Sequence, residues 1–167
     1  VASMMNNTGQ SCNAPSRMLV PADKLAEAEA IAAKVCESLK VGDPADKETV
    51  IGPIANERQF KRVQSMIENC QAEGAKLVCS GTGKPEGLDK GFYARPTVFS
   101  EVNNQMLIAR EEIFGPVLVM LPYKDVDDAV AIANDSDYGL SGYVYGASED
   151  DAAKVAARLR TGMVHLN

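Results

Sequence analysis

Apolar residues recur every three or four positions in several segments of the chain, which is the pattern of helices that bury one face. The segments cover residues 25–39, 60–70, 125–134 and 152–159. Ser148 and Asp151 form a capping box at the start of the last segment. We therefore predict about four helices, with Cys36 and Cys70 on the apolar faces of the first two.

Short apolar runs between these segments predict strands. They cover residues 17–21, 75–80, 96–99, 116–123, 140–145 and 163–166. Strands and helices that alternate at these lengths require right-handed crossover connections. The sequence thus predicts an α/β fold with three layers, α/β/α, around a mostly parallel sheet of about six strands. In such a sheet we expect ligands at the carboxyl ends of the strands.

Composition narrows the class of protein. The 167 residues are 46% hydrophobic and 24% charged, which suits one globular domain over residues 1–167. A net charge of -6 and a pI near 4.8 argue against a nucleic-acid partner or an anionic membrane surface.

The amino terminus and the length of the apolar runs indicate in which compartment the protein is found. No run approaches the roughly 18 to 20 apolar residues of a membrane span, and the amino terminus lacks the layout of a signal peptide. We therefore expect a cytoplasmic protein. Because the chain begins at Val1 without an initiator methionine, we expect it to be a piece of a longer protein.

The four cysteines differ in their surroundings. No Cys-x-x-Cys pair is present and His165 is the only histidine, so the sequence predicts no metal site. Cys36, Cys70 and Cys79 fall in predicted helices and a predicted strand, where a reduced packing role suffices. Cys12 instead lies among polar residues in a turn-rich segment, residues 6–13. It is either a small buried apolar residue or a thiol presented for chemistry, and its polar neighbours favour presentation.

A second polar segment precedes the most apolar strand. Residues 111–117 read Glu-Glu-Ile-Phe-Gly-Pro-Val, which places two carboxylates beside an aromatic ring before a Gly-Pro turn. From the residues alone, this is equally well a solvated acidic pair that leads into a core strand.

These two segments carry a family resemblance. Gly9-Gln10-Ser11-Cys12, followed by Ser16-Arg17, resembles the nucleophile motif of the NAD(P)-dependent aldehyde dehydrogenases, and residues 111–117 resemble a second motif of that family. The resemblance runs through the whole chain and implies that Cys12 is the nucleophile. It also implies that Glu112 binds the nicotinamide ribose and that Phe114 packs beside the nicotinamide.

The resemblance further implies what lies outside the chain. The family's cofactor-binding domain, oxyanion asparagine and glutamate general base precede this segment, and a C-terminal segment follows it. The chain would be the catalytic domain of a longer enzyme, a homodimer or homotetramer that oxidises a small-molecule aldehyde with NAD or NADP. There is no Gly-x-Gly-x-x-Gly or Walker sequence here, so we expect no tight cofactor binding and no activity from this chain alone.

Two other interpretations stay open. The first is a cysteine hydrolase with Cys12 as nucleophile, His165 as base and Asn167 as orienting residue, an order that resembles papain-like enzymes. The absence of tryptophan and the α/β alternation argue against it. The second is a folded fragment without catalytic activity.

Overall fold

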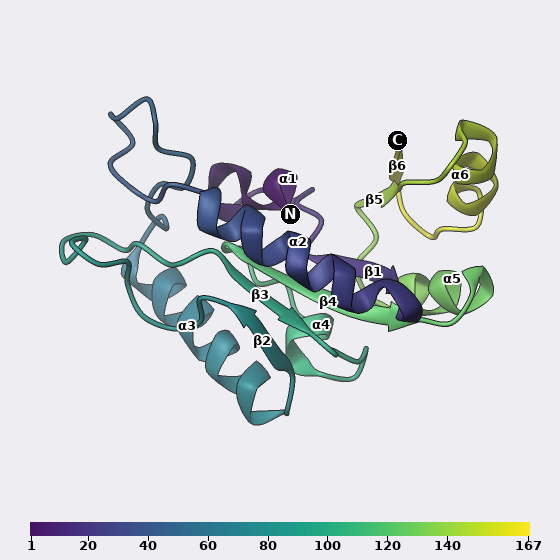
Figure 1. The fold of residues 1–167 in the computed structure, drawn as a ribbon, viewed down its shortest axis with the longest axis horizontal. Coiled ribbons are helices and arrows are strands. Elements are labelled where there is room, and N and C mark those ends of the chain that lie inside the picture. Colours follow the sequence, from purple (N-terminus) through teal and green to yellow (C-terminus); the bar gives the residue numbers. More distant parts are fainter.

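The structure is a computed structural model that describes residues 1–167 (Figure 1). Its central sheet has four strands in the order β1-β4-β3-β2. They are β1 (Arg17–Pro21), β2 (Lys76–Cys79), β3 (Thr97–Ser100) and β4 (Val117–Tyr123). β1, β4 and β3 run parallel, and β2 is an antiparallel edge strand.

β4 is buried on both faces because its apolar residues are continuous. Successive side chains of a strand point to opposite faces of the sheet. Val117, Val119 and Leu121 join a cluster that includes Phe99 and residues of the helices on one face, whereas Leu118 and Met120 join a second cluster on the other. The central strand thus connects two cores.

Helices cover both faces of the sheet. α1 (Ala2–Met5) and α2 (Leu25–Ser38) bury residues in one cluster, and α3 (Glu57–Ala72) and α4 (Leu107–Arg110) bury residues in the other. α2 and α3 lie on opposite sides of the sheet, and α5 (Val126–Asn134) follows the end of β4 (Figure 1). Short 3-10 turns at Asn6–Gly9 and Ala22–Lys24 connect α1 to β1 and β1 to α2.

The remaining elements form a separate small layer, which we call the C-terminal unit (residues 141–166). β5 (Ser141–Val144) and β6 (Met163–Leu166) pair in parallel, and α6 (Glu149–Ala156) connects them. This unit lies beside α5, away from the four-stranded sheet (Figure 1). Ser148 caps α6 through a hydrogen bond from the Asp151 N–H at 3.2 Å, as the capping box predicted.

The predicted α/β class with a mostly parallel sheet is confirmed, and so are all six strand segments. The prediction of about six strands in one sheet needs correction, because four form the central sheet and two form the C-terminal unit. Strand propensity locates strands but does not say which strands pair. The short helices α1 and α4 were not predicted. No helix is long and apolar enough to cross a membrane.

Candidate active site

Cys12 lies at the second position of a β-turn. The Ala14 N–H donates to the Ser11 carbonyl at 3.0 Å, which closes the turn over Cys12 and Asn13. Both of these central residues are exposed. The thiol is therefore presented to solvent, and the alternative of a small buried cysteine is wrong.

The chain before the turn is fixed to the segment around Pro53. The Thr8 hydroxyl donates to the Gly52 carbonyl at 3.1 Å, and Thr8 is buried. The Gln10 amide bonds in both directions: its Nε2 donates to the Pro53 carbonyl at 3.4 Å, and its Oε1 accepts from the Ala55 N–H at 2.8 Å. These bonds hold Thr8 in the left-handed region at φ 60°, a costly conformation for a branched residue.

The chain after the turn is fixed to the C-terminal unit. The Asn13 carbonyl accepts from the Ser141 hydroxyl at 3.3 Å and from the Tyr143 hydroxyl at 3.1 Å. Both donors come from β5. The Cys12 turn is thus held on its two sides by different parts of the molecule.

Arg17, the last residue of the motif, is the first residue of β1 and forms hydrogen bonds with distant parts of the chain. Its Nη1 donates to Asn104 Oδ1 at 2.6 Å, and its Nη2 donates to the Ala133 carbonyl at the end of α5 at 2.9 Å. Burial, with Arg110 nearby, lowers the pKa of Arg17, and Asp135 partly offsets this. Arg17 therefore connects the first strand to α5, the element that leads toward the C-terminal unit.

The second motif forms a loop that is held through its backbone by α3. Gln59 Nε2 donates to the carbonyls of Ile113 and Phe114, each at 2.9 Å, and Arg62 Nη2 donates to the Glu112 carbonyl at 2.7 Å. Phe114 has a positive φ of 54°. Polar side chains of a helix thus fix a strained loop through its backbone carbonyls.

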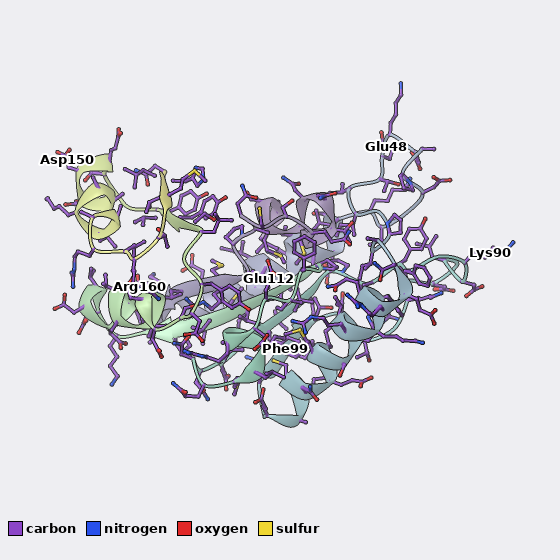
Figure 2. All side chains as sticks on the ribbon, turned by 180° about the vertical axis from the view of Figure 1, so that it is seen from behind. Glu48, Lys90, Phe99, Glu112, Asp150 and Arg160 are labelled. Atoms are coloured by element: carbon purple, nitrogen blue, oxygen red, sulfur yellow. The ribbon has the colours of Figure 1, made fainter.

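The two glutamates of this loop differ. Glu111 Oε2 lies 3.8 Å from Arg62 Nη2, whereas the Glu112 carboxylate has no ion pair or hydrogen bond. Only the Glu112 backbone is held, since its N–H donates to the Tyr138 hydroxyl at 3.2 Å. Glu112 is near the middle of the molecule (Figure 2). Its carboxylate is available to accept hydrogen bonds from a ligand.

Gly9 brings the first motif into contact with the second, and Gly115 lets the second motif pack on α3. A Cβ on Gly9 would lie 2.1 Å from the Gly115 carbonyl oxygen, and a Cβ on Gly115 would lie 2.5 Å from Val63 Cγ2. Only glycine permits this approach. The Cys12 loop therefore packs directly on the loop of Glu112 and Phe114.

This contact lies at the amino ends of the parallel strands. β1 begins at Arg17 and β4 at Val117, just after the two loops. The two motifs therefore lie at the end of the sheet opposite to the carboxyl ends, where a ligand site was expected. That rule holds for loops that follow strands, whereas both motifs precede theirs.

Of the other cysteines, Cys36 and Cys70 are buried, and Cys79 is half-buried. The hydrogen bond with Cys36 lowers the pKa of Cys79. Burial raises the pKa of Cys70 to about 12, and a hydrogen bond with Cys79, together with burial, raises the pKa of Cys36. Both thiols stay protonated near neutral pH and are poor nucleophiles. No cluster of three or more His, Cys, Asp or Glu side chains that could hold a metal is present.

The structure argues against the hydrolase interpretation. The His165 ring stacks on Tyr143 with centroids 4.6 Å apart, and it forms no hydrogen bond with Cys12. Asn167 Oδ1 accepts from the Gly146 N–H at 2.8 Å, so it does not orient His165.

Sequence reasoning missed the residues that hold the two loops. Gln59, Arg62, Ser141 and Tyr143 lie far from either motif in sequence. No local pattern marks them, because each acts through a backbone carbonyl of a distant loop. The glycine in each motif was the available sequence signal that the two loops pack together, since Gly9 lies against the Gly115 carbonyl.

Comparisons with known proteins agree with the two motifs. The model of the "Aldehyde dehydrogenase family" matches residues 1–167. A 3-succinoylsemialdehyde-pyridine dehydrogenase from Pseudomonas sp. is 59% identical over 167 residues, which is 100% of this chain and 35% of that protein.

Solved structures of similar proteins have the same fold. A mutant of aldehyde dehydrogenase C (AldC) from Pseudomonas syringae, in complex with NAD+ and octanal, is 56% identical, with a TM-score of 0.97 over 99% of this chain and 34% of that one. An aldehyde dehydrogenase from Mycobacterium tuberculosis with NAD+ is 45% identical, with a TM-score of 0.96 over 99% and 34%. The chain thus spans about a third of the length of the relatives it matches.

Proposed function

The chain belongs to the aldehyde dehydrogenase family, and from this premise we propose that residues 1–167 form the catalytic domain of a longer enzyme that oxidises an aldehyde with NAD(P). One observation carries the proposal: the segment that leads into the exposed Cys12 turn packs, at Gly9, on Gly115 of the loop that presents Glu112 and Phe114. A nucleophile and a cofactor-binding loop must lie this close for hydride to pass between substrate and cofactor.

In the proposed reaction, the Cys12 thiolate attacks the aldehyde carbonyl carbon and forms a thiohemiacetal. The Cys12 N–H is available to donate to the oxygen that becomes negative. Loss of a hydride from the carbon and of a proton from the hydroxyl would turn the thiohemiacetal into a thioester on Cys12, and a bound nicotinamide would accept the hydride. Water then cleaves the C–S bond, which releases the carboxylic acid and returns the thiol.

The residues of the second loop fit a nicotinamide nucleotide. Glu112 has a free carboxylate that can accept from ribose hydroxyls, and Phe114, which is 37% exposed, offers an apolar ring beside it. Nicotinamide, when bound, supplies the hydride acceptor. Glu112 and Phe114 are therefore the cofactor-binding residues that we propose in this chain.

The substrate is proposed only as an aldehyde. The relative from Pseudomonas sp. is described as acting on a pyridine semialdehyde, and the Pseudomonas syringae structure contains octanal, so similar chains accept different aldehydes. NAD+ in two similar structures supports NAD as the cofactor. We further propose a cytoplasmic enzyme that assembles as a homodimer or homotetramer.

Replacement of the nucleophile tests this function in the full-length enzyme. We expect Cys12→Ala to abolish aldehyde-dependent NADH formation, whereas Cys36→Ala, which removes a buried thiol, keeps most of it. In the native wild type, iodoacetamide should label Cys12 faster than Cys36, Cys70 or Cys79, as ranked by mass spectrometry, because Cys12 is the exposed thiol. Oxidation that survives Cys12→Ala would refute the proposal.

The two glutamates supply a matched pair of variants. Glu112→Gln should slow hydride transfer about 10-fold or more, because the loss of a charged acceptor misplaces the nicotinamide ring. Glu111→Gln should change it less than about 2-fold, since that side chain makes only an exposed ion pair with Arg62. Single-turnover measurement of NADH formation separates the two. Equal rates for the two variants would mean that Glu112 is only a surface carboxylate.

A further inference from the structure

The strongest feature that the proposed reaction leaves unexplained is the face of the C-terminal unit that meets the Cys12 turn. Ser141 and Tyr143 lie on one face of β5, since they are two residues apart. Both hydroxyls reach the same atom, the Asn13 carbonyl oxygen, at 3.3 and 3.1 Å. A carbonyl oxygen has two acceptor positions, so the two hydroxyls use both.

The accepting carbonyl belongs to the residue after the nucleophile. It follows Cys12 within the turn closed by the Ser11–Ala14 hydrogen bond. This carbonyl belongs to the Asn13–Ala14 peptide, which joins the Cys12–Asn13 peptide at the Asn13 Cα. A shift of the carbonyl therefore moves the short turn that bears the thiol. The turn is held before Cys12 by Gln10 and after it by these hydroxyls.

The tyrosine is itself held in place. Its partner across the parallel pair is His165, and the two rings stack with centroids 4.6 Å apart and planes 17° from parallel. A stacked ring has fewer orientations, so its hydroxyl stays directed at the turn. His165 of β6 therefore helps to hold the Tyr143 hydroxyl, the hydrogen-bond donor of β5, in place.

We propose that Tyr143, with Ser141, is a positioning residue of the nucleophile: its hydroxyl holds the Asn13 carbonyl and thereby sets where the Cys12 sulfur meets the substrate and the hydride acceptor. The inference rests on the proposed function. Loss of one neutral hydrogen bond moves the turn without unfolding it, so the rate of hydride transfer falls while substrate affinity stays.

The test compares Tyr143→Phe with Tyr145→Phe in the full-length enzyme. The Tyr145→Phe variant loses the same hydroxyl, but the Tyr145 side chain is 74% exposed and makes no hydrogen bond. We expect Tyr143→Phe to lower the single-turnover rate of NADH formation about 3- to 10-fold. KM for the aldehyde and the urea midpoint should stay unchanged, and Tyr145→Phe should behave as wild type. Ser141→Ala should have a smaller effect, which Ser141→Thr should rescue.

Amide hydrogen exchange supplies a readout that does not need activity. Tyr143→Phe should speed exchange in residues 11–16, where the Ala14 N–H closes the turn. If this exchange is unchanged, or if it rises without a fall in the single-turnover rate, the positioning role is refuted. If the wild type forms no NADH with any aldehyde, the proposed function fails, and exchange alone decides whether the hydroxyl holds the turn.

Discussion

The four-stranded sheet and the C-terminal unit are stabilised in different ways. The sheet has two apolar clusters, and Phe99 lies at its centre (Figure 2). The C-terminal unit buries only Ala152. It is joined to α5 by polar contacts: Asn134 Nδ2 donates to the Arg158 carbonyl at 2.9 Å, and the Arg160 N–H donates to Asn134 Oδ1 at 2.7 Å.

This difference matters because the Cys12 turn lies between the two regions. The residues before the turn are hydrogen-bonded to the part of the chain that contains the two apolar clusters. The residue after Cys12 is hydrogen-bonded to the C-terminal unit, which has little buried surface. Regions with few buried apolar contacts open at lower free energy. The geometry of the Cys12 turn therefore depends on the less stable of the two regions that hold it.

The largest effect we expect is from a core truncation in the sheet. Phe99→Ala should lower the free energy of unfolding by about 3–5 kcal/mol, because it removes a fully buried aromatic side chain. Leu166→Ala, in the half-buried β6, should cost about 1 kcal/mol, which is less than full burial gives. Urea denaturation measures both. Equal losses would show that the two regions do not differ in packing.

The same contrast separates what the sequence could predict from what it could not. Segments 17–21 and 116–123 are apolar enough to be recognised as strands, and both formed. The division into two sheets was not predictable, because residues 141–144 and 163–166 have strand propensity but too few residues to specify a partner.

The candidate site was predictable in its chemistry but not in its supports. Cys12 and Glu112 stand in motifs that are continuous in sequence, so their types and spacing are visible. The Tyr143 hydroxyl holds the Cys12 turn by a hydrogen bond to a carbonyl 130 residues away in sequence. Gln59 holds the Glu112 loop by a hydrogen bond to a carbonyl 55 residues away. Such contacts depend on tertiary structure, which a single sequence does not display.

The next effect in size concerns the contact between the two loops. Gly9→Ala should destabilise the protein by more than about 1–2 kcal/mol, because alanine at φ 67° is strained and its Cβ would lie 2.1 Å from the Gly115 oxygen. Gly74→Ala is the matched control: it also has a positive φ, of 92°, but nothing lies within 4 Å of its Cβ. The difference between their unfolding free energies isolates the clash. Equal costs would mean that the two loops separate freely.

The last expected effect is an alkaline loss of stability that originates at Cys70, in the apolar cluster between α3 and the sheet. Cys70 is fully buried, and burial raises its pKa to about 12 from an ordinary value near 9. Above pH 9 the unfolded thiol loses its proton while the folded thiol keeps it. The folded state then binds more protons, so the free energy of unfolding falls as pH rises, by at most about 1.4 kcal/mol per pH unit from this group.

Comparison of slopes tests this origin. Cys70→Ala lowers stability at every pH through its cavity, but it should flatten the decline between pH 9 and 11. Urea midpoints at several pH values measure the slopes. The C-terminal unit contains no cysteine. If stability falls with pH as steeply in Cys70→Ala as in wild type, the alkaline sensitivity does not come from the Cys70 core. That result would weaken the contrast between the two regions.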